Sequence, residues 1–248
     1  MPYLVAGDPD LDTTRRLIVE MEKNGADLIE LGIPFSDPMA DGPTNQLAAM
    51  RALKNGATLA KTLEMLSALR QETQIPIMLM GYYNPFYHYG LEKFCLDAAA
   101  AGADGLIIPD LQPDAAGEIR DFADASGLAT VFLIAPTSTD ERLKLVGRES
   151  RGFVYAVSLT GVTGARSALP GELTAFIERA RKLISLPIAV GFGIGTPEMA
   201  QAVGKIADGV IVGSAIVKII QHSVETGNDP VIQVGEMVAK MAAAVKRR

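Results

Sequence analysis

Short apolar segments recur from one end of this 248-residue sequence to the other, and none of them alternates regularly between apolar and polar residues. A strand buried on both faces of a parallel sheet reads as such a run. Amphipathic segments with helical spacing separate the runs, so we expect parallel strands joined by helices. The predicted strands are Tyr3–Ala6, Leu28–Leu31, Ile77–Met80, Gly105–Ile108, Thr130–Ile134, Phe153–Val157, Ile188–Val190 and Val210–Val212.

Eight strand–helix units divide the chain evenly. They average 31 residues each, which is the size of one unit of a (β/α)8 barrel. No shift in composition and no low-complexity linker separates the units, so we expect residues 1–248 to form one barrel domain. An open, doubly wound sheet is the alternative, and eight regular units with no edge strand favour the barrel.

Composition argues against several classes of function. The net charge is −6, and Lys and Arg are scattered without a basic stripe, which argues against binding to nucleic acid or to anionic membranes. No stretch approaches the roughly 20 apolar residues of a membrane helix, and no secretory signal precedes the first strand. The single cysteine, Cys95, cannot form an intramolecular disulfide. We therefore expect a protein of the reducing cytoplasm.

One acidic residue lies near the end of the second predicted strand and another in the loop after it, and the C-terminal ends of the strands carry the active site of such a barrel. Glu30 lies within the strand, where a buried carboxylate costs several kcal/mol unless it is paired or protonated. Asp41 lies in loop 33–44, whose prolines and glycine can hold an acid in place. A structural glutamate and an ordinary turn are the alternatives. Together, the two acids predict a two-carboxylate catalytic system.

Glycine-bearing segments follow the last three predicted strands. Segments 191–197 and 213–216 occupy the usual position of a barrel phosphate site, where backbone N–H groups and a helix N-terminus bind a dianion. Their spacing does not match a dinucleotide fingerprint. Loop 158–169 carries two glycines among hydroxyl side chains, which suits either a closing lid or an ordinary connector.

Other chemistries find little support in the sequence. All ten lysines lie in helical patterns or at their ends, so a Schiff-base aldolase is not expected. His88 and His222 lack metal-ligand spacing, and we predict no metal or cofactor. The reaction is therefore expected to use carboxylates, backbone donors and a tyrosine such as Tyr155.

The segment Leu31–Pro43, with Glu30 before it, closely resembles the signature of the tryptophan synthase alpha subunit family. Shorter matches occur in the same order along essentially the whole chain. The resemblance implies a lyase that splits indole-3-glycerol phosphate into indole and glyceraldehyde 3-phosphate. The shorter matches are Gly7-Asp8-Pro9, Tyr82-Tyr83-Asn84-Pro85, Ile108-Pro109-Asp110-Leu111, Gly161-Val162-Thr163-Gly164-Ala165 and Gly191-Phe192-Gly193-Ile194.

The resemblance also implies roles for individual positions. Glu30 matches the residue that moves the proton between the substrate's ring and its glycerol hydroxyl, and Asp41 matches the residue that binds the indole N–H. Thr163 matches a lid residue that helps to set Asp41. The implied substrate-binding residues are Tyr3, Tyr82, Tyr155, Thr163 and Phe192. The implied phosphate-binding residues are Gly164, Gly193, Gly213 and Ser214.

Members of the family pair with a pyridoxal-phosphate-dependent beta subunit, so an α2β2 heterotetramer is the implied assembly. Five of the 14 aromatic residues lie in segment 82–89, predicted as a loop at the barrel mouth. This loop suggests a recognition surface, with self-packing as the alternative.

One feature departs from the resemblance. The family usually has a helix before the first strand that covers the bottom of the barrel, and no segment of this sequence matches it. We therefore expect apolar side chains to face water at that end. Two other functions stay open: a different phosphate-binding barrel enzyme, and a catalytically idle activator of a synthase partner.

Overall fold

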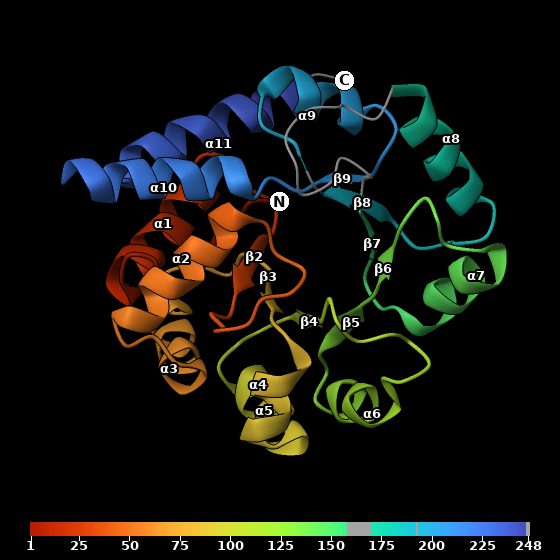
Figure 1. Cartoon of the computed structure of the whole chain (residues 1–248), viewed down its shortest axis with the longest axis horizontal. Coiled ribbons are helices and arrows are strands. Elements are labelled where there is room, and N and C mark those ends of the chain that lie inside the picture. Colours follow the sequence, from red (N-terminus) through yellow and green to blue (C-terminus); the bar gives the residue numbers. More distant parts are fainter. Residues whose placement is uncertain (158–169, 192, 247–248) are drawn as a thin grey trace.

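Short parallel strands lie at the centre of the molecule, inside a ring of helices (Figure 1). The computed structural model describes residues 1–157, 170–191 and 193–246. Strands pair in chain order, β1 to β5 in one sheet and β6 to β9 in the next. The strands are β1 (Tyr3–Val5), β2 (Ile29–Gly32), β3 (Ile77–Met80), β4 (Gly105–Ile107), β5 (Ala129–Val131), β6 (Leu133–Ile134), β7 (Val154–Val157), β8 (Ile188–Gly191) and β9 (Gly209–Val210).

Two junctions join these sheets into the (β/α)8 barrel. At one, Pro2 and Val212 form a parallel bridge. At the other junction, β5 pairs with β4, and β6 pairs with β7. Phe132, between β5 and β6, belongs to neither ladder. Its N–H donates to the Ser150 hydroxyl at 3.3 Å. The predicted strand Thr130–Ile134 is thus broken at Phe132, which corrects the sequence interpretation. The other seven predicted strands are confirmed, with ends that differ by two residues or fewer.

The helices form the outer layer because each has one apolar face, which packs on the strands. Polar side chains start several of them. Asp10 caps the first helix by accepting the Thr13 N–H at 2.7 Å. The helices are α1 (Leu11–Lys23), α2 (Pro43–Lys54), α3 (Leu59–Leu69), α4 (Tyr83–Tyr89), α5 (Leu91–Ala100), α6 (Gly117–Ala125), α7 (Asp140–Glu149), α8 (Pro170–Arg181), α9 (Pro197–Gly204), α10 (Ser214–Thr226) and α11 (Val231–Lys246).

Segment 82–89 is helical, so its prediction as a loop was wrong. Pro85 lies in the first turn of α4, where its missing N–H costs no helical hydrogen bond. Phe86 is buried and stacks on Phe94 of α5, with ring centroids 4.1 Å apart. Part of the aromatic cluster therefore packs against the barrel, while Tyr87 is 61% exposed.

Side chains on the inner face of the strands fill the barrel below its mouth. Burying apolar area of this kind contributes roughly 25 cal/mol per Å². Because the interior is packed, the open space for a ligand lies above it, at the C-terminal ends of the strands. The packed interior group is Met78, Ile107, Val131, Phe153, Tyr155, Ala189 and Ile211.

A second cavity, of about 310 Å³, lies at the opposite end, beside the starts of β1, β2 and β9. Met237, Met241 and Val245 of α11 line it, so this helix borders the bottom of the barrel. Met1 and Leu28 are partly exposed there, which agrees with the expected contact between apolar side chains and water. Among the helices described, none is long and apolar enough to cross a membrane.

Candidate active site

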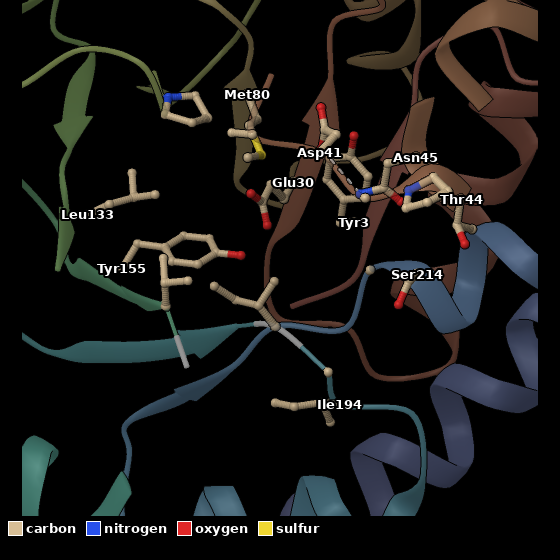
Figure 2. Close-up of a pocket in the computed structure, with 18 of the residues that line it drawn as sticks. Tyr3, Glu30, Asp41, Thr44, Asn45, Met80, Leu133, Tyr155, Ile194 and Ser214 are labelled. Atoms are coloured by element: carbon tan, nitrogen blue, oxygen red, sulfur yellow. Dashed lines mark hydrogen bonds between the residues drawn. The ribbon is translucent and has the colours of Figure 1, made fainter. Parts of the chain in front are cut away.

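A cavity of about 440 Å³ opens at the C-terminal ends of the strands. Residues from β1, β2, the loop before α2, β7 and the start of α10 line it (Figure 2). The walls combine two acids and two tyrosine rings with the apolar side chains of Met80, Leu133 and Ile194. An apolar cavity with a few converging polar groups is the usual form of a small-molecule site.

Glu30 projects from β2 into this cavity, between the rings of Tyr155 and Tyr3 (Figure 2). Its side chain is buried, and neither carboxyl oxygen has a hydrogen-bond partner among the described residues. Burial raises the pKa of Glu30 to about 8; the Met1 ammonium opposes this rise and the Asp41 carboxylate adds to it. Glu30 is therefore mostly a neutral acid at pH 7.

Asp41 lies just before α2 and is held from two sides. The Tyr82 hydroxyl donates to Asp41 Oδ2 at 2.9 Å and accepts the Ala40 N–H at 2.9 Å. Asn45 Nδ2 donates to Asp41 Oδ1 at 3.4 Å, and Gln46 Nε2 donates to the Asp41 carbonyl at 2.9 Å. Burial raises the pKa of Asp41, and the hydrogen bonds from Tyr82 and Asn45 oppose that rise. The environments of the two acids thus differ: Glu30 has no hydrogen-bond partner in the described part of the chain, whereas hydrogen bonds fix Asp41.

Tyr3 and Tyr155 are buried phenols on the cavity wall. Burial raises the pKa of both hydroxyls well above the ordinary value, so both stay neutral hydrogen-bonding groups. Each ring lies across a glycine of the neighbouring strand. A Cβ on Gly32 would lie 2.6 Å from the Tyr3 hydroxyl, and a Cβ on Gly191 would clash with that of Tyr155. Glycine at these two positions gives the tyrosines room to reach the cavity.

Gly193, Gly213 and Ser214 line another part of the same cavity. Helix α10 begins at Ser214, and no side chain of the described residues caps it, so its first N–H groups have no side-chain acceptor there. Such a helix N-terminus attracts anions. Lys218, one turn into α10, is the one cation among the described lining residues.

The structure brings together eight of the predicted site residues. Thr163, Gly164 and Phe192 lie outside the described residues, as does the whole of segment 158–169, the candidate lid. Tyr3, Glu30, Asp41, Tyr155, Gly193, Gly213 and Ser214 line the cavity, and Tyr82 reaches it through Asp41.

Sequence reasoning missed three polar residues at this site, Thr44, Asn45 and Lys218. The last two carried a usable signal. Asn45 follows Asp41 by four residues at a helix start, and Lys218 lies four residues beyond Ser214 on one helix face. Among the described residues, no group of three or more His, Cys, Asp or Glu side chains could hold a metal ion.

Comparisons with known proteins agree over the whole chain. The family model described as tryptophan synthase alpha chain matches residues 1–246. The alpha chain of Geotalea daltonii is 50% identical over 243 residues, covering 98% of this chain and 91% of that protein. The alpha chain of Dehalococcoides mccartyi is 54% identical over 219 residues, covering 88% and 86%.

Solved structures give the same answer. The alpha subunit from Legionella pneumophila str. Paris superposes with a TM-score of 0.93 at 39% identity, covering 100% of this chain and 92% of that one. A chain of the tryptophan synthase α2β2 complex from Pyrococcus furiosus superposes with a TM-score of 0.89 at 41% identity, covering 98% and 96%. The chain therefore belongs to the tryptophan synthase alpha chain family, whose members cleave indole-3-glycerol phosphate to indole and glyceraldehyde 3-phosphate in tryptophan biosynthesis.

Proposed function

We propose that Glu30 and Asp41 carry out this cleavage at the mouth of a single catalytic domain formed by residues 1–248. The observation that carries the proposal is the state of Glu30, a buried acid without a hydrogen-bond partner among the described residues. With a pKa of about 8 it can give up a proton and take one back near neutral pH. A strongly perturbed acid in a cavity is typical of a catalytic group.

The reaction needs one proton delivered and one removed. Glu30 donates its proton to C3 of the indole ring, which leaves a positive charge delocalised onto the ring nitrogen. The resulting carboxylate removes the proton of the glycerol hydroxyl next to the ring. The O–H electron pair forms the aldehyde C=O, the carbon–carbon bond breaks, and its electron pair returns to the ring. Glu30 ends protonated, and the products are indole and glyceraldehyde 3-phosphate.

Asp41 stabilises the cationic ring in this scheme. Its carboxylate accepts the indole N–H and faces the positive charge that develops there, so it interacts more strongly with the transition state than with the substrate. Tyr82 and Asn45 donate to its two oxygens, and these hydrogen bonds favour its ionised form against the effect of burial. Neither a lysine nor a metal is required, because the protonated ring itself accepts the electron pair.

The remaining predicted residues bind the two ends of the substrate. Tyr3 and Tyr155 border the indole, with the apolar side chains of Met80, Leu133 and Ile194. Gly193, Gly213 and Ser214 bind the phosphate, supported by the start of α10. For Phe192, Gly164 and Thr163, which lie outside the described residues, the family resemblance alone supports roles toward the indole, the phosphate and Asp41.

A beta subunit that depends on pyridoxal phosphate is the proposed partner, in an α2β2 assembly. Met39 in loop 33–44 is 86% exposed, and Met50 on α2 is 62% exposed, which supports a docking surface beside the mouth. The buried free thiol of Cys95 suits a reducing compartment, so we place the complex in the cytoplasm.

Partner binding is tested by sedimentation of the chain mixed with its beta subunit. The Met39→Glu variant is expected to weaken the complex. Ile232→Glu changes a side chain of similar type on α11, 63% exposed, and is the control. Equal loss in both variants, or no complex with the unchanged chain, contradicts the docking surface.

Turnover of indole-3-glycerol phosphate by the purified chain tests the proposed chemistry. Glu30→Gln keeps the shape of the side chain and removes the titrating proton, so turnover is expected to fall by about 10²-fold or more while the substrate still binds. Glu64→Gln, on an exposed face of α3, is the matched control. A Glu30→Gln enzyme that keeps most of its activity rules out the mechanism, and a native chain that binds the substrate without cleaving it indicates an idle activator.

A further inference from the structure

We propose that the buried ion pair between Asp8 and Arg51 positions Asp41 for the reaction by fastening α2 to the loop after β1. This inference rests on the proposed function of Asp41. Asp8 Oδ1 accepts from Arg51 Nε at 2.9 Å, and Oδ2 accepts from Nη2 at 2.8 Å. The Asp8 side chain is 1% exposed and that of Arg51 is 22% exposed. A two-pronged contact of this kind fixes direction as well as distance.

The start of α2 carries Asp41 with it. Helix α2 begins at Pro43, two residues after Asp41. Its first turn binds the acid twice: Gln46 donates to the Asp41 carbonyl and Asn45 donates to the carboxylate. A displacement of α2 along the barrel therefore moves the carboxylate that faces the substrate.

Apolar packing alone specifies the position of α2 weakly. All three of its buried side chains are alanines, namely Ala48, Ala49 and Ala52. Two of them pack in a small cluster with Tyr3 and Val5 of β1. Methyl groups interdigitate less than large side chains, so they oppose sliding less strongly. Directional polar contacts are therefore needed to fix the position of α2 along the barrel.

A second polar contact anchors the far end of the same helix. Asn55, at the C-terminus of α2, donates from its side chain to the Pro9 carbonyl at 2.7 Å. Asp8 and Pro9 belong to one short loop, so this loop holds α2 at two places. Tyr82, between β3 and α4, holds Asp41 directly from the other side. The acid is thus fixed between two supports, and the ion pair belongs to one of them.

Loss of the pair is expected to lower kcat more than it raises KM. Asp8 and Arg51 do not line the cavity, and the proposed phosphate-binding residues lie after β8 and at the start of α10, whereas Asp41 acts on the charge that develops in the transition state. A misplacement of about 1 Å at a catalytic group can cost about 10²-fold. Arg51→Met is therefore expected to reduce kcat by roughly 10- to 100-fold with KM changed by about 3-fold or less. Arg51→Lys keeps the positive charge and one donor group. Its kcat is therefore expected to lie between that of the native chain and that of Arg51→Met.

The control removes an equally buried arginine elsewhere. Arg120 is 23% exposed and pairs with Glu149, between α6 and α7 and away from the cavity. Arg120→Met is expected to lower the midpoint of urea unfolding as Arg51→Met does, while kcat stays unchanged. If both variants lose kcat equally, or neither does, the Asp8–Arg51 pair is only structural and the inference is wrong.

A double-mutant cycle with Asp41→Asn separates this inference from the proposed function. If Arg51 acts through Asp41, Arg51→Met is expected to have little further effect on kcat once Asp41 is an amide. Full additivity overturns the positioning role and leaves the function of Asp41 intact. A single Asp41→Asn variant with native kcat overturns the proposed function instead.

Discussion

Replacing Glu30 by glutamine is expected to stabilise the protein at alkaline pH while it abolishes turnover. The pKa of Glu30 is about 8 in the fold, against an ordinary value of 4.5. Between these two values the folded chain holds a proton that the unfolded chain has released. Stability falls as pH rises through this window, because the unfolded state binds fewer protons than the native state. This loss of stability, the penalty for ionising the buried Glu30, is absent below pH 4.5 and complete above pH 8.

The size of the effect follows from the same two values. The full difference corresponds to roughly 5 kcal/mol, at 1.36 kcal/mol for each pH unit. By the linkage relation, about 1 kcal/mol of this penalty is present at pH 5, and nearly all of it at pH 9. The free energy of unfolding of Glu30→Gln, relative to the native chain, is therefore expected to rise by roughly 4 kcal/mol between pH 5 and pH 9.

Urea unfolding of both proteins at the two pH values measures this change. An uncharged glutamine in the same place costs a constant amount, so the difference between the two pH values isolates the titration of Glu30. Glu64→Gln, at an exposed position, is the control and is expected to show no such rise. If the free energies of unfolding of Glu30→Gln and of the native chain differ by the same amount at pH 5 and pH 9, that result refutes the protonated, buried state of Glu30.

Three further predictions concern activity. The pH profile of kcat/KM is expected to fall as pH rises through about 8, where Glu30 loses its proton, and a profile still flat at pH 10 would contradict this role. Tyr82→Phe removes a hydrogen bond that lowers the pKa of Asp41, so the acidic limb of the profile is expected to move to higher pH and kcat to drop about 10-fold. An acidic limb at the native pH would show that Tyr82 does not influence the ionisation of Asp41. Gly213→Asp places a carboxylate at the phosphate end and is expected to raise KM at least about 10-fold, whereas Gly117→Asp on α6, with open space around it, is the control; equal KM values for the two would remove Gly213 from the phosphate site.

Local sequence was sufficient to predict the barrel because buried parallel strands leave a strong signal. The runs at Ile77–Met80 and Ile188–Val190 could not be half-exposed strands, and eight regular units favoured closure. The break at Phe132 left no such signal, because the run from Thr130 to Ile134 stays apolar throughout. What interrupts it is a hydrogen bond from the Phe132 N–H to the hydroxyl of Ser150, eighteen residues along the chain. Contacts of this range cannot be read from a local pattern.

The two acids were predicted, and the resemblance gave Tyr82 as a substrate-binding residue, but the hydrogen bond from Tyr82 to Asp41 and the Asp8–Arg51 pair were not predicted. Glu30 stood out because a carboxylate within an apolar strand violates the pattern around it. The hydrogen bond from Tyr82 to Asp41 joins residues 41 positions apart, and the contact between Asp8 and Arg51 joins residues 43 apart. Each of these polar residues has an ordinary place in a turn or helix, so nothing local distinguishes it. Segment 82–89 was predicted as a loop for a related reason, because its proline and aromatic residues are common in loops. The packing of Phe86 on Phe94, which belongs to the helical structure, is not visible in the local sequence.

The two acids illustrate how one fold gives similar groups different chemistry. Glu30 is fixed by a strand and has no hydrogen-bond partner among the residues that the structure describes, so burial disfavours its charged form and raises its pKa to about 8. Asp41 lies on a loop, where burial alone would also favour the neutral form, and hydrogen bonds from Tyr82 and Asn45 oppose that tendency. An acid on a strand needs no further positioning, whereas an acid on a loop depends on whatever holds the loop. Changes far from the substrate, such as those at Arg51, are therefore expected to act on Asp41 and to leave Glu30 unaffected.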